Sequence, residues 1–337
     1  MPRTYIEQLR APGQIVEDVY QVASKDFRTT KKGAYFISAR LRDRTGELRA
    51  IMWDATQALF AAIPQGGYAL VKGRAGEFNG APQIVIEAMR PAKESEIHLE
   101  DFLPVGSGNP EEQLARLREI LGTVERPALR AFLDAFWKDE ALVAAFKRAP
   151  AAERLHHAYL GGLLEHTLSI AETAMLVCQH YTQLDRDILL VGILWHDIGK
   201  TRELAYAEAL GYTDAGKLVG HLVQGVLMLE EKFAQVRATG TDFPEELANV
   251  LRHMVLAHHG THEFGSPKLP MTAEAFTLHH LDNLDAKLHA FFRDVAADAD
   301  PARRWTAWNK MFGGALYKGF EIAVEEEEPD EELKGGL

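Results

Sequence analysis

The chain has 337 residues, enough for two domains, and its 47% hydrophobic and 26% charged residues are ordinary for a soluble globular protein. The single cysteine, Cys178, excludes an intrachain disulfide and fits a reducing compartment. No apolar run approaches the roughly 18 residues that a membrane helix needs. The first residues hold no apolar signal segment, so the sequence predicts a cytoplasmic protein without a membrane partner.

The net charge of −12 argues against a nucleic-acid partner for the chain as a whole, but the charge is uneven. Residues 1–93 hold 14 Lys and Arg against 9 Asp and Glu, a net +5, whereas the remainder holds 23 against 40, a net −17. This asymmetry is a hint that the N-terminal part binds nucleic acid. Part of the acidic excess is the segment 325–332, which we expect to be a solvated end, with an inhibitory mimic of a nucleic-acid strand as the alternative.

Residues 12–90 have the pattern of short strands separated by turns. The expected elements are strands at 14–22, 34–42, 48–53, 68–73 and 83–88, with a helix at 55–63. Five short strands with a helix between the third and the fourth is the order of an OB-fold barrel. We therefore predict an N-terminal OB-fold domain over residues 1–93.

The second and third expected strands alternate apolar with basic and aromatic residues. OB-fold barrels bind single strands on this face through basic and aromatic side chains. The candidate nucleic-acid-binding residues are Phe36, Arg40, Arg42, Arg49 and Trp53. The pattern leaves open an alternative in which the two aromatic residues close the barrel core and the arginines form a solvated face.

Residues 94–110 have the Pro and Gly content of a linker. From Glu111 onward apolar residues recur at helical spacing, and a second helix is expected to begin at Pro127. The further expected helices lie at about 140–148, 158–181, 186–195, 217–236, 244–257, 272–298 and 301–311. We predict an all-helical domain over residues 111–315 and an acidic C-terminal tail at 316–337, and hence a multidomain chain with separate α and β parts.

Histidines and acids that could bind metal recur through the helical part. His196 and Asp197 follow the apolar run 188–195 and precede Gly199. The other candidates are His166, His221, His258, His259 and Asp282. A single helical histidine is more often a core or surface residue than a ligand, so the prediction depends on the joint pattern. Imidazole and carboxylate donors without sulfur exclude a cysteine-type zinc site, and more than four candidates suit two metals bridged by Asp197, as in phosphoester hydrolysis.

The order of these residues resembles the HD-domain metal-dependent phosphohydrolases. The strings GGLLEHT, WHDIGK, GHL, AHHG and LDNLDAK resemble one subfamily, the bacterial 3′-to-5′ exoribonucleases that join an N-terminal OB-fold to an HD domain. The string KKGAYFISARLRDRTGELRAIMWD resembles the OB-fold portion of that subfamily. The resemblance covers about residues 12–315 and implies a five-stranded OB-fold barrel followed by an all-α HD domain.

The resemblance also implies a ligand set for two divalent ions. His166, His196, Asp197 and Asp282 would hold one ion. Asp197, His221 and one or both of His258 and His259 would hold the other. Manganese or cobalt is usual in the subfamily, and the ligand set does not exclude iron or zinc. Asp285 is expected to support a ligand or pack its helix, and Lys200 to contact a substrate phosphate, with a surface lysine at a helix end as the alternative.

The implied activity is 3′-to-5′ hydrolysis of single-stranded RNA to nucleoside 5′-monophosphates, with DNA as a further candidate substrate. A hydroxide between the two metals would attack the phosphorus, with Asp197 and Lys200 in the catalytic centre and His259 as a candidate proton donor. The barrel would hold the strand upstream of its 3′ end. The subfamily also suggests a homo-oligomer.

Two alternatives remain at this point. The first is an HD-type phosphohydrolase of small nucleotides, with the OB-fold as a regulatory or protein-contact module. The second is a binding protein whose metal site is vestigial, against which the filled ligand positions argue.

Overall fold

The computed structural model describes residues 3–9, 11–31, 33–78, 80–103, 106, 108–152, 157, 159–206, 211–298 and 303–319. The chain divides into two compact units, Met1–Ala286 and Lys287–Leu337, which are described separately. Residues 320–337 of the expected tail, residues 301–302 of the expected last helix and parts of the expected linker lie outside the described residues. No helix in the described part of the chain is long and apolar enough to cross a membrane.

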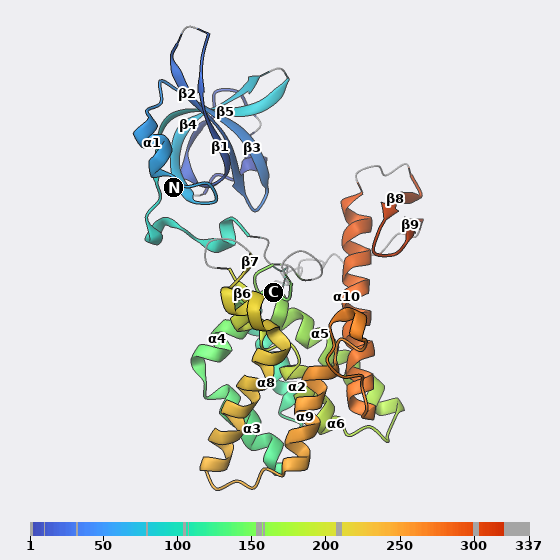
Figure 1. The fold of residues 1–337 in the computed structure, drawn as a ribbon. Helices are drawn as coiled ribbons and strands as arrows, with labels where there is room; N and C mark the ends of the chain where they lie inside the picture. The colour runs from blue at the N-terminus through green and yellow to red at the C-terminus, as the bar shows by residue number, and fades with distance from the viewer. Residues whose placement is uncertain are drawn as a thin grey trace, which may run out of the picture. The chain divides into compact units, whose positions relative to one another are not determined.

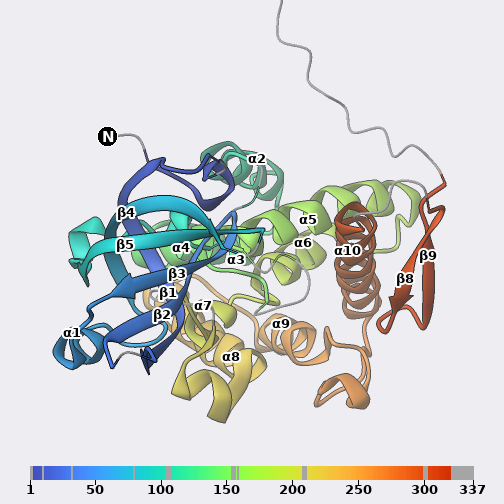
Figure 2. The same cartoon turned by 90° about the horizontal axis from the view of Figure 1, so that it is seen from above.

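The first part of the chain forms a closed five-stranded barrel (Figures 1 and 2). Its strands are β1 (Ile15–Thr29), β2 (Tyr35–Asp43), β3 (Gly46–Trp53), β4 (Tyr68–Phe78) and β5 (Ala81–Pro91). The order is β1-β2-β3-β5-β4, with β3 and β5 parallel and the other neighbours antiparallel. Helix α1 (Gln57–Ala62) connects β3 to β4. The predicted OB-fold barrel is confirmed.

Alternation along β2 separates a core face from a solvent face. Ile37, Ala39 and Leu41 are buried in the barrel core, because successive side chains of a strand point to opposite faces. The barrel closes tightly at Gly73, where β4 has a bulge. A Cβ at this position would lie 2.3 Å from the carbonyl oxygen of Val85, so the close approach of β4 to β5 requires glycine.

The expected linker contains short structure of its own. It holds two 3-10 turns, Glu94–Glu96 and Leu99–Asp101. Phe102 follows them and is buried with Val19 and Tyr68, and the Tyr68 and Phe102 ring centroids are 4.6 Å apart. The start of this segment therefore packs on the barrel.

The rest of the first unit is helical, as predicted. Its helices are α2 (Pro110–Leu121), α3 (Pro127–Trp137), α4 (Glu140–Arg148), α5 (Gly162–His180), α6 (Arg186–Trp195), α7 (Lys200–Glu203), α8 (Asp214–Ala238), α9 (Glu245–Ala257) and α10 (Ala273–Ala297). A two-stranded pair, β6 (Leu204–Ala205) and β7 (Gly211–Tyr212), lies between α7 and α8. Helix α5 begins later than residue 158, because Gly161 before it has a left-handed φ of +84°.

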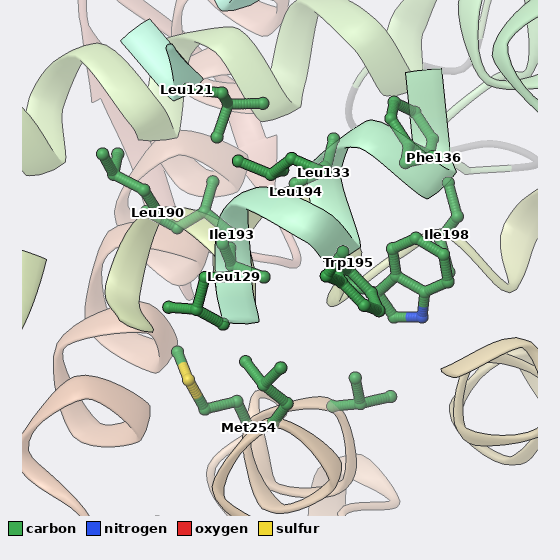
Figure 3. Packing of buried hydrophobic residues seen from close by; sticks show 14 of the residues in the cluster. Leu121, Leu129, Leu133, Phe136, Leu190, Ile193, Leu194, Trp195, Ile198 and Met254 are labelled. Carbon is green, nitrogen blue, oxygen red and sulfur yellow. The ribbon is translucent and has the colours of Figure 1, made fainter. Parts of the chain in front are cut away.

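Helix α6 lies at the centre of the helical core (Figure 3). Its residues from Leu189 to Trp195 are all buried, which fits a helix that is apolar on every side. Trp195 packs against Phe132 at a centroid distance of 4.8 Å, and its indole N–H donates to the carbonyl oxygen of Gly225 at 3.0 Å. The end of α6 is therefore held rigidly, and His196 and Asp197 follow directly.

In the second unit the predicted helix at 301–311 is wrong. Trp305–Asn309 is a strand, β8, which pairs with β9 (Gly314–Tyr317) in a hairpin (Figures 1 and 2). Aromatic and β-branched residues in this segment favour a strand, and Gly313 in the turn has a φ of +65° that favours glycine.

Candidate metal centre

His196 and Asp197 lie at the end of α6 and are almost completely buried. The Nδ1–H of His196 donates to the carbonyl oxygen of Ile193 at 2.7 Å, in the last turn of the helix. A carbonyl can only accept, so the neutral ring carries its lone pair on Nε2. This is the arrangement in which a histidine is oriented to bind a metal.

The turn after Asp197 is fixed by a close contact with α8. A Cβ at Gly199 would lie 2.1 Å from the carbonyl oxygen of His221, so only glycine fits where this turn meets α8. The glycine that follows the His-Asp pair thus brings the pair next to His221.

Two more histidines at the end of α9 repeat the pattern of His196. The Nδ1–H of His258 donates to the carbonyl oxygen of Val255 at 2.8 Å, and that of His259 to Phe264 at 2.8 Å. Burial lowers the pKa of His258 to about 3 and also lowers the pKa of His259. Both rings are therefore neutral at physiological pH, with their Nε2 atoms available as ligands.

His221 is placed by a break in α8. Gly220 has non-helical angles, φ 76° and ψ 160°, inside this helix. The backbone N–H of His221 donates to Oε1 of Glu203 at 3.0 Å, and its Nδ1–H lies 3.0 Å from Oε2 of the same carboxylate. Burial raises the pKa of Glu203, but the hydrogen bonds from His221 outweigh this effect and hold the pKa below its ordinary value. Sequence reasoning missed Glu203, and its only signal was an acid six residues after Asp197.

His166 of α5 is fully buried between two carboxylates of α10. Its Nε2 lies 3.1 Å from Oδ1 of Asp282, and its Nδ1 lies 2.7 Å from Oδ2 of Asp285. Burial disfavours the charged ring, but the two carboxylates more than offset this and raise the pKa of His166 to about 9. A metal at Nε2 would therefore replace a proton.

Asp285 contacts more than one side chain of the site. Besides His166 it accepts a hydrogen bond from the Ser169 hydroxyl, and it lies 3.1 Å from Nε2 of His157. Burial raises its pKa, but the hydrogen bonds from His157 and His166 hold the pKa well below the ordinary value. Asp285 thus orients His166 from the side opposite Asp282. His157 and Ser169 were not predicted.

Asp197 lies between two groups of histidines. Its Oδ1 is 3.6 Å from Nε2 of His221 and 3.5 Å from Nε2 of His258. Its Oδ2 is 3.4 Å from Nε2 of His196 and 3.8 Å from Nε2 of His166. These separations are slightly longer than the roughly 3.0–3.4 Å expected between ligand atoms that are each about 2.1 Å from one metal ion.

Lys200 is also in contact with Asp197. Its Nζ lies 2.6 Å from Oδ2 of Asp197, and its side chain is mostly buried. Burial raises the pKa of Asp197, but the charges of Lys200 and His196 hold the pKa well below its ordinary value. The structure therefore places Lys200 at the carboxylate rather than on the surface.

Two observations show that this donor set fits a metal. Nε2 of His196 and Oδ1 of Asp197 are buried without a hydrogen-bond partner, which costs about 1–3 kcal/mol for each such atom. Nε2 of His221 and Nε2 of His259 are only 3.2 Å apart, although the Nδ1 of each ring already donates elsewhere. Two facing lone pairs repel each other unless a cation lies between them.

The structure brings all seven predicted ligands into one cluster. The groups whose donor atoms lie within 4.8 Å of one another include His166, His196 and Asp197; His196, His258 and Asp282; and His221, His258 and His259. No sulfur atom belongs to these groups, which matches the prediction of a site with nitrogen and oxygen donors only.

The predicted nucleic-acid-binding residues lie on neighbouring strands of the barrel. Phe36 is opposite Trp53, and Arg40 is opposite Arg49. The Phe36 and Trp53 rings are 5.1 Å apart, and Trp53 is 49% exposed. Neither ring belongs to the buried barrel core, so the alternative that they close the core is wrong.

The remaining charges on this face have partners. Arg42 pairs with Glu47, which also lies 3.6 Å from Arg40, and Arg49 lies 5.3 Å from the Phe78 ring centroid. The exposed side chains of Tyr35 and Phe78 add to the aromatic surface of the barrel and were not predicted.

A His-Asp cluster in an all-helical domain, joined to an OB-fold barrel, defines an HD-domain protein with an appended OB-fold module. A family model described as the HD domain matches residues 163–287. A second, described as an OB-fold nucleic acid binding domain, matches residues 21–92. An HD domain implies that divalent metal is bound at the cluster.

Curated relatives cover most of the chain. The 3′-5′ exoribonuclease YhaM of Bacillus subtilis (strain 168) is 31% identical over 286 residues, which is 85% of this chain and 89% of the relative. The YhaM of Geobacillus sp. (strain WCH70) is 32% identical over 282 residues, 83% of this chain and 85% of the relative. That of Bacillus pumilus (strain SAFR-032) is 33% identical over 262 residues, 77% of this chain and 81% of the relative. The chain belongs to the YhaM family of 3′-5′ exoribonucleases.

Proposed function

We propose that this protein is a metal-dependent 3′-to-5′ exonuclease that hydrolyses single-stranded RNA to nucleoside 5′-monophosphates. The observation that carries the proposal is the position of Asp197, whose two oxygens face separate groups of histidines. A carboxylate in this position suits two ions of the kind that catalyse phosphodiester hydrolysis. The 3′-5′ exoribonuclease names of the relatives supply the polarity and the substrate.

The proposed ligands follow the two groups of donor atoms. One ion would be held by His166, His196, Asp197 and Asp282. The other would be held by Asp197, His221, His258 and His259. Bound divalent ions supply Lewis acidity at the phosphoryl oxygens and lower the pKa of a water molecule, which phosphodiester hydrolysis needs at neutral pH. Manganese is our first choice, with cobalt, iron or zinc as alternatives.

Residues of the chain complete the proposed centre. The Lys200 ammonium next to Asp197 would stabilise negative charge on the non-bridging phosphoryl oxygens. The orientation of His259, with its Nδ1–H bonded to Phe264, favours a ligand role over the expected proton donor, because Nε2 then carries a lone pair. Glu203 and Asp285 would hold His221 and His166 in place.

The barrel would bind the strand upstream of the reacting end. Phe36 and Trp53 offer stacking surfaces, and Arg40, Arg42 and Arg49 offer cations for the phosphates. We keep domain boundaries at 1–93 for this module, 94–110 for the linker, 111–315 for the HD domain and 316–337 for the tail. A cytoplasmic location and a homo-oligomeric assembly belong to the same proposal and rest on the sequence and the resemblance alone.

The proposal is tested with 5′-labelled single-stranded RNA and Mn²⁺, using the full chain beside Asp197→Ala and Glu231→Gln variants. We expect a ladder that shortens from the 3′ end with the wild type and with the Glu231 variant, whose exposed carboxylate pairs with Arg202. The Asp197 variant should be inactive while its circular dichroism stays unchanged. Intact RNA together with hydrolysis of small nucleotides would replace the proposal by the small-molecule phosphohydrolase.

A further inference from the structure

The β8–β9 hairpin of the second unit has one buried and one exposed face. Leu316 is 4% exposed and lies on the buried face. Trp305 and Trp308 are 55% and 74% exposed. Trp305 is opposite Tyr317 in the register of the hairpin, and the centroids of these two rings are 5.0 Å apart. A short hairpin that exposes two large aromatic side chains has a surface suited to binding a partner.

Exposed tryptophans are confined to two places in this chain. Of its five tryptophans, Trp137 and Trp195 are at least partly buried in the helical core. The exposed ones are Trp53, on the barrel face proposed to bind a strand, and Trp305 and Trp308 of the hairpin. The hairpin thus repeats the kind of side chain that the barrel offers for stacking on bases.

The charge of the hairpin is opposite to that of the chain. Residues 303–318 contain four basic residues and no acidic one, in a chain of net charge −12. These residues are Arg303, Arg304, Lys310 and Lys318. Arg303, Arg304 and Lys310 are exposed. Such a local positive surface on an acidic protein is complementary to a polyanion.

The side-chain contacts keep this surface available to a ligand. The Arg304 guanidinium donates to the Tyr317 hydroxyl at 2.7 Å and lies 5.5 Å from the Tyr317 ring centroid. Lys318 pairs with Asp298 at 2.7 Å, which anchors the end of β9. The exposed cations and the Trp305 and Trp308 rings therefore lie together on a fixed two-stranded scaffold.

We propose that the outward face of this hairpin is a second binding surface for single-stranded nucleic acid. The rings stack on bases, whatever their sequence, and Arg303, Arg304 and Lys310 contact phosphates. This combination favours a strand over an anionic membrane surface, because a membrane-binding element presents a larger continuous apolar face than two rings flanked by polar residues. The proposal goes beyond the function above, which assigns strand binding to the barrel alone.

The test measures binding by the full chain in EDTA, so that no strand is hydrolysed. The probe is a fluorescein-labelled oligouridylate of about 30 nucleotides, longer than the roughly 4–16 nucleotides that one OB-fold covers. The Trp305→Ala/Trp308→Ala variant should raise the Kd about fivefold or more. The Arg303→Gln/Lys310→Gln variant should reduce the slope of log Kd against log salt by about 1.4, since each contact with a single strand contributes about 0.7.

Matched controls separate the hairpin from general surface effects. Leu176→Ala removes an equally exposed apolar side chain from α5, and Arg130→Gln/Lys138→Gln removes two exposed cations from α3. Both controls should leave the Kd and the salt slope unchanged. If the double tryptophan variant loses its circular dichroism, Trp308→Ala alone carries the test, because Trp308 is the more exposed ring.

A second measurement locates the contact. A 4-thiouridine strand should cross-link, on irradiation, to a peptide that contains Trp305 or Trp308. Unchanged binding in both hairpin variants would overturn the proposal, and so would hairpin variants that lose only phosphatidylglycerol vesicles or only a self-association seen by light scattering. The outcome is independent of the nuclease activity, and Trp53→Ala, measured in parallel, reports on the barrel separately.

Discussion

At the scale of single residues, the centre depends on how each histidine is oriented. His196, His258 and His259 donate their Nδ1–H groups to backbone carbonyls, whereas His221 and His166 depend on the side chains of Glu203 and Asp285. The second kind of support can be removed by substitution. Outer carboxylates of this kind fix the ring orientation and raise the basicity of a ligand.

Glu203→Gln should therefore weaken metal binding at the site of His221. The amide keeps one acceptor but loses the charge that faces both the backbone N–H and the ring. We expect the affinity of one Mn²⁺ ion to fall about 10- to 100-fold, as is typical when such a partner is lost. Isothermal titration calorimetry checks this, with Glu231→Gln as the matched control. An unchanged affinity would show that Glu203 has only a packing role.

Sequence reasoning reached the ligands of this centre but not their supports. Imidazole and carboxylate donors in a fixed order identified His196, Asp197 and their partners. Glu203 escaped because its contact with His221 depends on the break at Gly220, and no periodic pattern marks a single non-helical residue inside a helix. His157 escaped because only tertiary packing brings it to Asp285.

At the scale of elements, α8 is tied to α4 through a buried cation. Lys232 of α8 is 3% exposed, and its ammonium donates to Asp139 at 2.7 Å. The other oxygen of Asp139 caps α4 by accepting the N–H of Leu142. The hydrogen bonds from Lys232 and Leu142 hold the pKa of Asp139 below its ordinary value.

Asp139→Asn should destabilise the helical domain in a pH-dependent way. The amide keeps the cap but leaves Lys232 without a counter-charge, for which we expect roughly 1–3 kcal/mol at neutral pH, given the partial exposure of Asp139. A lowered pKa in the folded state means that the stabilisation is present above about pH 4 and is lost as the pH falls through the folded value. The difference between wild type and variant should therefore shrink in acid. Urea unfolding followed by circular dichroism measures it.

Asp134→Asn is the matched control for this prediction. It changes an exposed aspartate of α3 near Asp139 and should leave the stability unchanged at every pH. A difference between wild type and the Asp139 variant that stays constant into acid would contradict the ion-pair explanation.

Element boundaries were predictable where one pattern dominated. The ranges 140–148 and 186–195 coincide with α4 and α6, because clear N-cap aspartates precede both helices. The segment 301–311 was wrongly predicted as a helix. Its apolar residues fit either period over so short a length, and the pairing with β9 decides the outcome.

At the scale of the whole molecule, the division of charge follows the division of labour that we propose. The barrel part carries +5 and the remainder −17, so binding of a polyanion to the helical part depends on help from elsewhere in the chain. OB-fold and HD modules could both be identified from the sequence. Their arrangement around a strand could not, because no local pattern encodes it.

Trp53→Ala should reduce activity on long strands selectively. Loss of one stacking surface costs about 1–3 kcal/mol per base, so the KM for a long RNA should rise at least about fivefold, whereas hydrolysis of a dinucleotide should be unaffected. Steady-state kinetics on both substrates test this in the full chain. A substitution is preferable to deleting residues 1–93, because Phe102 packs on Val19 and Tyr68 and would be uncovered.

Two results would count against the feeding role of the barrel. Equal losses on the long strand and the dinucleotide would indicate a folding defect, which Leu176→Ala helps to recognise as a surface control. No loss on either substrate would leave strand binding to other parts of the chain.

The backbone carbonyls that accept from His196, His258 and His259 have a consequence for how the centre tolerates mutation. No side-chain substitution at Ile193, Val255 or Phe264 deletes these acceptors, since each is a main-chain oxygen. The three rings are thus buffered against sequence drift as long as the local backbone persists. His221 and His166 have no such protection, and homologous sequences should vary freely at the first set of partners while preserving an acid at Glu203 and Asp285.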